Sequence, residues 1–203
     1  MKISYAITVC DELHEVKRLL DQLIQLKREE DEIVVLLDKT KSSIRLENML
    51  ANYNIKLHTD YFDGHFADWK NKLNSFCTGD YIFQIDADEY PHEDLIAELP
   101  EILAANSHVE AFVVPRVNTV EGLTAEHIQK WGWNVNDKGW VNFPDHQWRI
   151  YKNKPSIKWK NKVHEVIEGY MIMAQIPGYE FFSLYHPKSI ERQERQNNYY
   201  NTL

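Results

Sequence analysis

The sequence predicts an α/β protein built on a doubly wound, mostly parallel β-sheet. In the first ninety residues, short β-rich runs alternate with segments whose apolar residues recur at helical spacing. This alternation favours parallel strands joined by right-handed crossovers. The run EIVVLL is apolar throughout, as expected of a strand that is covered on both faces. Ligands of such sheets bind beyond the carboxyl ends of the strands, so the residues that follow each strand are candidates for a site.

Each element of this half follows from a local pattern. Strands are expected where apolar and β-branched residues form short runs, namely KISYAITV, EIVVLL, IKLH and YIFQI. Helices are expected from Leu13 to about Lys27, from about Ser42 to Asn52 and near 66–76. Thr8 to Glu12, Asp38 and the acids at 86–89 follow strands and should therefore surround one crevice.

The pattern changes after residue 91. HEDLIAELPEILA predicts a helix with an acidic first turn and an interruption at Pro100, and VEAFVVP predicts another strand. Short strand-like runs and turns follow and carry five of the six tryptophans, which predicts a small β-rich region. The tail SIERQERQNNYYNTL is polar on nearly every side and predicts an exposed terminal helix.

The composition is that of an ordinary globular protein. The 203 residues, 43% hydrophobic and 27% charged, suffice for one compact domain. The apolar part of MKISYAITV stops at Cys10, which is too early for a signal-peptide core or a transmembrane segment. Cys10 and Cys77 form neither a CxxC pair nor a zinc pattern. We therefore expect a cytoplasmic protein with reduced cysteines.

The net charge of −8 disfavours a protein that wraps nucleic acid with its whole surface. A basic stretch nevertheless runs from Arg149 to Lys162, with aromatic residues among its lysines. It is either a solvated strand face that alternates with buried aromatic rings or a surface for an anionic ligand, and both interpretations stay open.

Three acids follow the strand YIFQI in the stretch IDADE. Asp86 and Asp88 are separated by one residue, so in a loop their carboxylates can converge on one point. There they could hold Mn²⁺ or Mg²⁺, with phosphate oxygens as further ligands. The structural alternative is that Asp88 or Glu89 caps the next helix, with Pro91 near its first turn.

The order of the segments TVCDE, VVLLD, WKNKLN and GDYIFQIDADE resembles the nucleotide-sugar half of a family 2 glycosyltransferase of the GT-A fold. The later segments PDHQWRIYKN and IKWKNKVHEVIEG are similar to a bacterial and phage branch with a V-H-E signature. The resemblance covers residues 3 to about 188 and implies one GT-A domain over residues 1–203. Residues 1–90 would form the nucleotide-sugar half, and residues 91–203 the acceptor half with the C-terminal helix.

The resemblance also implies roles for single residues. The loop from Thr8 to Glu12 would hold the nucleoside, although CDE departs from the commoner Pro-x-x-Asn-Glu form. The residues expected to bind the nucleotide sugar are Thr8, Cys10, Asp11, Glu12, Asp38, Lys70, Asn71, Asp86, Ala87, Asp88 and Lys188. The expected metal ligands are Asp86, Asp88 and His186, with His164 as the competitor of His186.

An inverting transfer also needs a general base within hydrogen-bond reach of the acceptor hydroxyl. Asp145 in FPDHQ is the first candidate and Glu165 in VHE the second; the structural alternative for Asp145 is an ordinary turn after proline. Trp133, Trp140, Arg149 and His164 are expected to bind the acceptor. The tryptophans would be either platforms for sugar faces or core residues.

The sequence thus predicts a metal-dependent glycosyltransferase that moves a sugar from a nucleotide diphosphate, expected to be a UDP-sugar, to a hydroxyl of a cell-surface glycan. A phage enzyme that glycosylates a modified DNA base is one alternative, and a non-catalytic, metal-dependent sugar-binding module is another. A nucleotidyltransferase is disfavoured because TVCDELHEV contains no glycine-rich phosphate loop. The sugar, the acceptor, the stereochemical outcome and the oligomeric state stay open.

Overall fold

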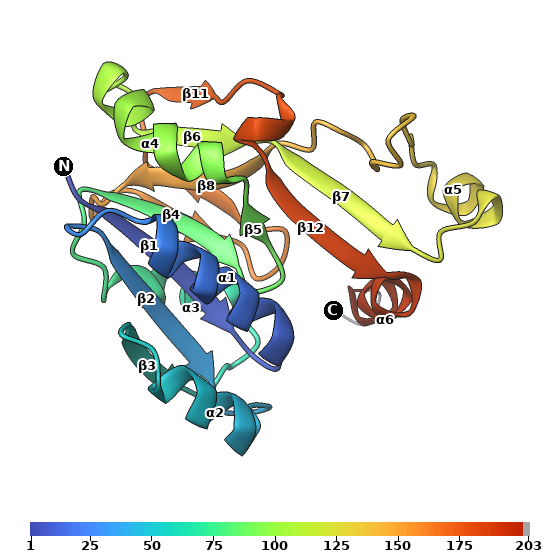
Figure 1. The fold of residues 1–203 in the computed structure, drawn as a ribbon, viewed down its shortest axis with the longest axis horizontal. Coiled ribbons are helices and arrows are strands. Elements are labelled where there is room, and N and C mark those ends of the chain that lie inside the picture. The colour runs from blue at the N-terminus through green and yellow to red at the C-terminus, as the bar shows by residue number, and fades with distance from the viewer. Residues whose placement is uncertain (201–203) are drawn as a thin grey trace.

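The computed structural model describes residues 1–200, and a seven-stranded sheet forms its centre (Figure 1). The strands, in their order across the sheet, are β11 (Met173–Gln175), β6 (Ala111–Val114), β8 (Gln147–Lys152), β4 (Tyr81–Asp86), β1 (Ile3–Val9), β2 (Glu32–Asp38) and β3 (Lys56–Asp60). The four strands of the first half pair in parallel, as predicted. β8 is antiparallel to both of its neighbours, so strands from the second half complete the same sheet.

Helices cover both faces of this sheet. The helices α1 (Leu13–Leu26), α2 (Ile44–Ala51) and α4 (Glu93–Ala105) pack on one face. The helix α3 (Phe66–Asn74) and the hairpin of β9 (Lys158–Lys160) and β10 (Val166–Glu168) pack on the other. Every residue of β2 is buried, because this strand lies inside the sheet and is covered from both sides.

The prediction for α4 was wrong in one respect, because the helix runs through Pro100 without interruption. Proline removes one backbone donor, but Leu95, Leu99 and Leu103 are fully buried against the sheet and hold the helix on both sides of it. His92 caps this helix, since its ring accepts a hydrogen bond from the backbone of Asp94. Neither Asp88 nor Glu89 is therefore the cap.

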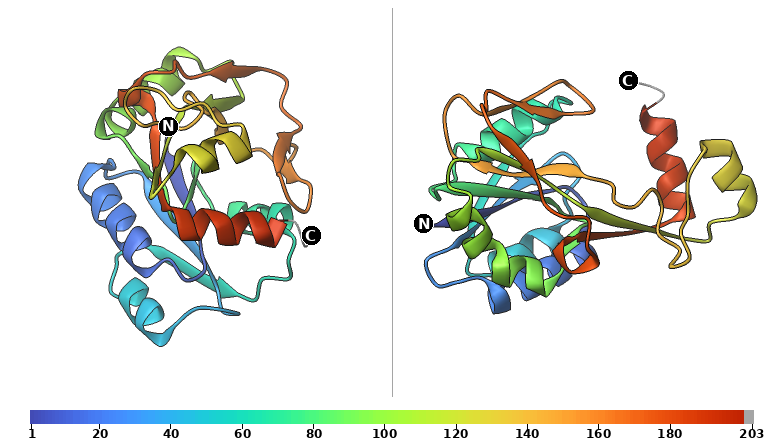
Figure 2. Two further views of the ribbon diagram at one scale, coloured as in Figure 1. Left: turned by 90° about the vertical axis from the view of Figure 1, so that its right-hand side faces the viewer. Right: turned by 90° about the horizontal axis from the view of Figure 1, so that it is seen from above.

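A second, smaller sheet extends beyond the first and contains part of the predicted β-rich region, whose strands β8 and β11 instead join the central sheet. It consists of β5 (Tyr90–Pro91), β12 (Leu184–Ser189) and β7 (Arg116–Glu121), with β12 in the middle. A 3₁₀ turn, η1 (Glu180–Phe182), precedes β12. The helices α5 (Ala125–Trp131) and α6 (Ile190–Tyr200) lie side by side at its far end (Figure 2). In the described part of the chain, no helix has both the length and the apolar character needed to span a membrane.

The tryptophans of the second half do not share one environment. Trp159 is buried on β9 between two exposed lysines, Lys158 and Lys160. This strand therefore alternates between solvated lysines and a buried ring, as one interpretation of the basic stretch predicted. Trp133 and Trp140, around α5, are partly exposed and belong to neither hydrophobic core.

Candidate active site

A crevice of about 1680 Å³ opens at the carboxyl ends of β1, β2 and β4, where the sequence predicted a site. The second sheet, the β9–β10 loop and α6 form its other walls. The predicted site residues that line it are Thr8, Cys10, Asp11, Glu12, Asp38, Lys70, Asp86, Ala87, Asp88, Arg149, His164, Glu165, His186 and Lys188. The lining does not include Asn71, Trp133, Trp140 or Asp145. The crevice is larger than a typical pocket for one small ligand, about 300–1,000 Å³.

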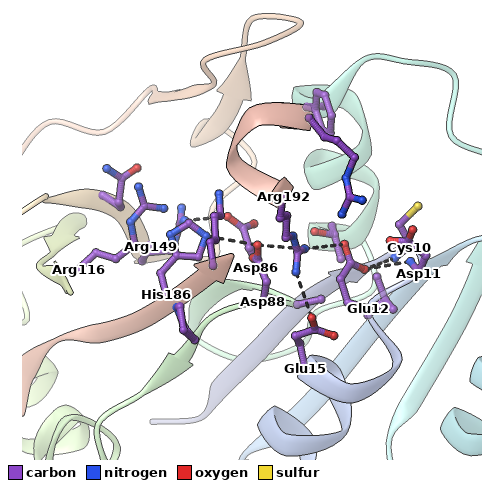
Figure 3. A pocket seen from close by; sticks show the side chains of 18 of the residues that line it. Cys10, Asp11, Glu12, Glu15, Asp86, Asp88, Arg116, Arg149, His186 and Arg192 are labelled. Carbon is purple, nitrogen blue, oxygen red and sulfur yellow. Dashed lines mark hydrogen bonds and ion pairs between the residues drawn. The ribbon is translucent and has the colours of Figure 1, made fainter. Parts of the chain in front are cut away.

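Asp88 and His186 face each other in this crevice (Figure 3). His186 Nε2 lies 3.3 Å from Asp88 Oδ2, and its Nδ1 lies 2.8 Å from Asn118 Oδ1. Burial lowers the pKa of His186 and outweighs the opposing effect of Asp88. Burial would raise the pKa of Asp88, but the hydrogen bond to His186 and the charges of Arg192 and Lys188 hold it far below its usual value.

Asn118 fixes which nitrogen of His186 faces Asp88. Its amide Nδ2 donates to Asp145 Oδ2 at 2.8 Å, so its Oδ1 is the atom that faces His186. The hydrogen-bond network thus assigns a proton to Nδ1, because only an N–H can satisfy that oxygen. With a proton on Nδ1, Nε2 donates a hydrogen bond to the Asp88 carboxylate only when the ring is protonated; in the neutral ring, Nε2 faces Asp88 with its lone pair.

Asp145 is linked to this pair through Asn118, and both of its carboxylate oxygens accept hydrogen bonds from protein groups. Its Oδ2 accepts from Arg116 at 2.6 Å as well as from Asn118, and its Oδ1 accepts from Gln147 at 2.7 Å. Burial would raise the pKa of Asp145, but Arg116 and these hydrogen bonds lower it. These contacts make Asp145 a partner of Arg116, and its role as the base stays a prediction.

Glu89 and Arg149 form the buried floor beneath the acids. Glu89 is fully buried and binds Arg149 through both carboxylate oxygens and Arg116 through one. Arg149 Nη2 also donates to Asp86 Oδ2 at 2.8 Å. Since Arg149 is 4% exposed and its donors serve Glu89, Asp86 and a backbone carbonyl, its contacts are those of a residue that positions Asp86. Arg149 also lines the crevice, and its predicted contact with an acceptor stays a prediction.

Glu165 enters the crevice from the other side, on the loop between β9 and β10. Lys70 Nζ lies 3.1 Å from Glu165 Oε1, 3.8 Å from Asp86 Oδ1 and 4.4 Å from the centre of the Trp159 ring. His164, next to Glu165, has a positive φ of 54° and lines the crevice. The loop thus brings a carboxylate into the crevice, within reach of Lys70.

The end of the crevice where the sequence analysis expects a nucleoside consists of the loop after β1 and the end of β2. Asp38 accepts hydrogen bonds from the backbone and hydroxyl of Thr40 and from the backbone of Phe62. Burial would raise the pKa of Asp38, but these hydrogen bonds lower it. Glu12 accepts from the backbone of Cys10 and Asp11, which closes the loop. Burial raises the pKa of Glu12, and the nearby Asp88 adds to the effect.

Besides Asp145, three residues of the predicted site lie outside the crevice lining. Asn71 exchanges two hydrogen bonds with the backbone of Trp159 and ties α3 to β9. Trp133 packs against Trp131, and Trp140 packs against Phe143. The structure therefore does not bring these two tryptophans to the crevice.

Several lining residues had no recognisable signal in the sequence. Arg116 begins β7, and Arg192 lies near the start of the polar tail helix, where nothing in the local pattern marks a site residue. Trp159 also lines the crevice, although the sequence analysis expected no site role for it. The partners of Arg116 and Arg192 lie far from them in sequence, so local spacing could not have identified them.

The comparisons with known proteins agree with this geometry. The model of Glycosyl transferase family 2 matches residues 4–176, which is most of the chain. The chain belongs to Glycosyl transferase family 2. This finding confirms the predicted family; the V-H-E branch stays a prediction.

Solved structures confirm the GT-A fold of this family 2 chain. Residues 1–349 of S. aureus TarS in complex with UDP-GlcNAc are 14% identical, with a TM-score of 0.63 over 93% of this chain and 59% of that one. The same fragment with UDP is 13% identical, with a TM-score of 0.63 over 92% and 60%. The chain thus spans about 60% of the length of these relatives. No curated protein matches it in sequence.

Proposed function

We propose that this family 2 chain transfers a sugar from a nucleotide diphosphate donor to an acceptor hydroxyl, with Mn²⁺ or Mg²⁺ as cofactor. The observation that carries the proposal is the pair of Asp88 and His186 in a crevice at the carboxyl ends of parallel strands. The structural likeness to TarS in complex with UDP-GlcNAc supports a UDP-sugar as the donor.

The residues present fit a divalent cation that is shared with a substrate. No group of three or more His, Cys, Asp or Glu in the described part of the chain is arranged to hold a metal by itself. Asp88 Oδ2 and His186 Nε2, however, are 3.3 Å apart, a spacing that suits two ligands each about 2.0–2.2 Å from one ion. Diphosphate oxygens and water would supply the remaining ligands, as they commonly do for Mg²⁺. A cation held there would neutralise charge on the departing diphosphate.

Asp86 has a different part in this proposal. Arg149 binds its Oδ2, and Lys70 lies near its Oδ1. These cations already balance its charge, so we infer that Asp86 orients the ribose or the sugar as a hydrogen-bond acceptor. Lys188, whose pKa burial lowers, lines the crevice beside His186 and would contact the diphosphate.

We infer that Glu165 is the general base. In a direct displacement, the acceptor oxygen bonds to the anomeric carbon, the bond from that carbon to the diphosphate oxygen breaks, and the acceptor proton passes to a carboxylate. Glu165 lines the crevice, whereas Asp145 is held by Arg116 and Asn118. The ion pair with Lys70 keeps Glu165 close to Asp86.

A glycan hydroxyl is the acceptor that we propose, and a modified DNA base is the alternative. The exposed lysines Lys158 and Lys160 lie on the hairpin that carries Glu165, so an anionic acceptor would meet them. DNA would show a steep loss of apparent affinity as salt rises, and a neutral glycan would not. A sugar-binding module without activity would bind the donor but leave it intact.

Thermal unfolding with nucleotides tests the proposal. The melting temperature is measured with UDP, GDP, CMP and TDP, each with and without Mn²⁺. A ligand that binds only the folded chain raises this temperature by mass action, so we expect a Mn²⁺-dependent rise with UDP. The absence of a rise with every nucleotide would overturn the donor assignment. Incubation with the matching UDP-sugars and glycan acceptors then distinguishes transfer from binding alone.

A further inference from the structure

Arg192, near the start of α6, lies among carboxylates from two other parts of the chain (Figure 3). Its Nη2 is 3.2 Å from Asp88 Oδ2 and 3.7 Å from Glu12 Oε1. Its Nη1 is 3.1 Å from Glu15 Oε1 at the start of α1. The guanidinium therefore joins the C-terminal helix to the nucleoside loop and to the acid proposed to bind metal.

Ion pairs link the described part of this helix to its surroundings. Its sequence IERQERQNNYY has no apolar stripe. Its Glu194 lies 3.7 Å from His127 of α5, and Arg192 supplies the ion pairs toward α1 and Asp88. Arg195, three residues further along the helix, also lines the crevice. Residues three apart share one face of a helix, so α6 presents two guanidinium groups to the same space.

Arg192 and His186 contact the same oxygen of Asp88. Nη2 of Arg192 and Nε2 of His186 are 3.2 and 3.3 Å from Oδ2. A divalent cation held between Asp88 and His186 would lie beside this oxygen and repel the guanidinium. The arginine and the metal therefore compete for one carboxylate.

We propose that Arg192 changes partners when the donor binds, an inference that rests on the proposed function. Before binding, its charge offsets Asp88, Glu12 and Glu15. When a divalent cation takes Asp88, Arg192 moves to the diphosphate of the donor, together with Arg195. The planar fork of arginine suits this ligand, because it can donate two parallel hydrogen bonds to phosphate oxygens. The metal and the diphosphate thus bind cooperatively, and Arg192 couples them.

The test measures Mn²⁺ and UDP affinities separately by titration calorimetry. Arg192→Gln removes the charge, and Arg45→Gln is the matched control, since Arg45 is exposed on α2 and outside the crevice lining. A charge-assisted contact of this kind is worth roughly a factor of ten. We expect Arg192→Gln to bind Mn²⁺ alone about tenfold more tightly and to bind UDP at saturating Mn²⁺ about tenfold more weakly.

Arg192→Lys keeps the charge without the fork. We expect its Mn²⁺ affinity to stay near that of the wild type and its UDP affinity to fall. Mn²⁺ affinity that is unchanged or weaker in Arg192→Gln overturns the competition, and UDP affinity equal to that of Arg45→Gln overturns the contact with the diphosphate. A wild-type chain that binds neither Mn²⁺ nor UDP overturns the proposed function itself, which separates the two failures.

Discussion

Arg149 holds the carboxylate of Glu89 with two hydrogen bonds, from Nε at 2.9 Å and from Nη2 at 2.7 Å, and both residues are buried. Arg116 adds a third contact at 3.0 Å. This arrangement explains how three acids can crowd the end of one apolar strand. Glu89 turns inward to the two arginines, Asp86 shares Arg149 with it, and Asp88 faces the crevice.

Glu89→Gln tests the contribution of this buried cluster to stability. The substitution keeps the shape of the side chain but removes the buried charge that Arg149 and the partly buried Arg116 share, and leaves them Asp86 and Asp145. Breaking a buried pair in this way costs about 3–5 kcal/mol of unfolding free energy. Urea denaturation at pH 7 measures the loss. Glu29→Gln, at an exposed position of the same residue type, should stay within about 0.5 kcal/mol of the wild type.

The same cluster predicts a dependence of stability on pH. Burial would raise the pKa of Glu89, but Arg149 and Arg116 lower it from 4.5 to about 2. Because the folded-state pKa lies below the unfolded value, the stabilisation is present above pH 4.5 and is lost as the pH falls toward 2. We expect the unfolding free energy of Glu89→Gln to fall less steeply over this range. If the unfolding free energies of the variant and the wild type changed equally with pH, the lowered pKa of Glu89 would be contradicted.

The sequence predicted the crevice well, because the ends of parallel strands meet at one edge of a sheet. Thr8 to Glu12, Asp38 and Asp88 all follow apolar strands, and each lines the crevice. Hydrophobic periodicity was enough to find these strands, and the order of the acidic segments was enough to find the family.

Charge pairing could not be predicted in this way. Arg149 binds Glu89 across 60 residues, and Arg116 binds Asp145 across 29. No local pattern links such positions, so the roles expected for Arg149 and Asp145 took no account of these partners. The predicted interruption at Pro100 was wrong for another reason: the tertiary packing of α4 outweighed the tendency of proline to break a helix.

Asn118→Ala tests whether His186 is held as a metal ligand. The variant removes the acceptor for Nδ1, so the ring loses both its orientation and its fixed tautomer. Loss of such an outer partner typically lowers metal affinity by about 10–100-fold. Titration with Mn²⁺ measures the change in metal affinity. Asn48→Ala, at an exposed position of α2, is the control. Equal Mn²⁺ affinity in both variants would mean that His186 does not depend on Asn118 for binding.

Asp88→Ala tests the metal assignment directly. The variant removes the oxygen that faces His186 and Arg192. We expect it to abolish Mn²⁺-dependent nucleotide binding while the circular dichroism spectrum stays that of the wild type. Binding of UDP is measured with and without Mn²⁺. Unchanged nucleotide affinity in the presence of Mn²⁺ would rule out Asp88 as a ligand.

Glu165→Gln and Asp145→Asn together test which carboxylate is the base. Glu165 lines the crevice, so its amide variant should bind the donor normally and lose transfer by about 10²–10⁴-fold. Asp145 balances Arg116, so its variant should lower the melting temperature and keep most of the transfer rate once folded. Single-turnover transfer at saturating donor and the Kd for UDP separate the two effects. The opposite ranking, with transfer lost only in a stable Asp145→Asn, would return the role of base to Asp145 and leave Glu165 as a partner of Lys70.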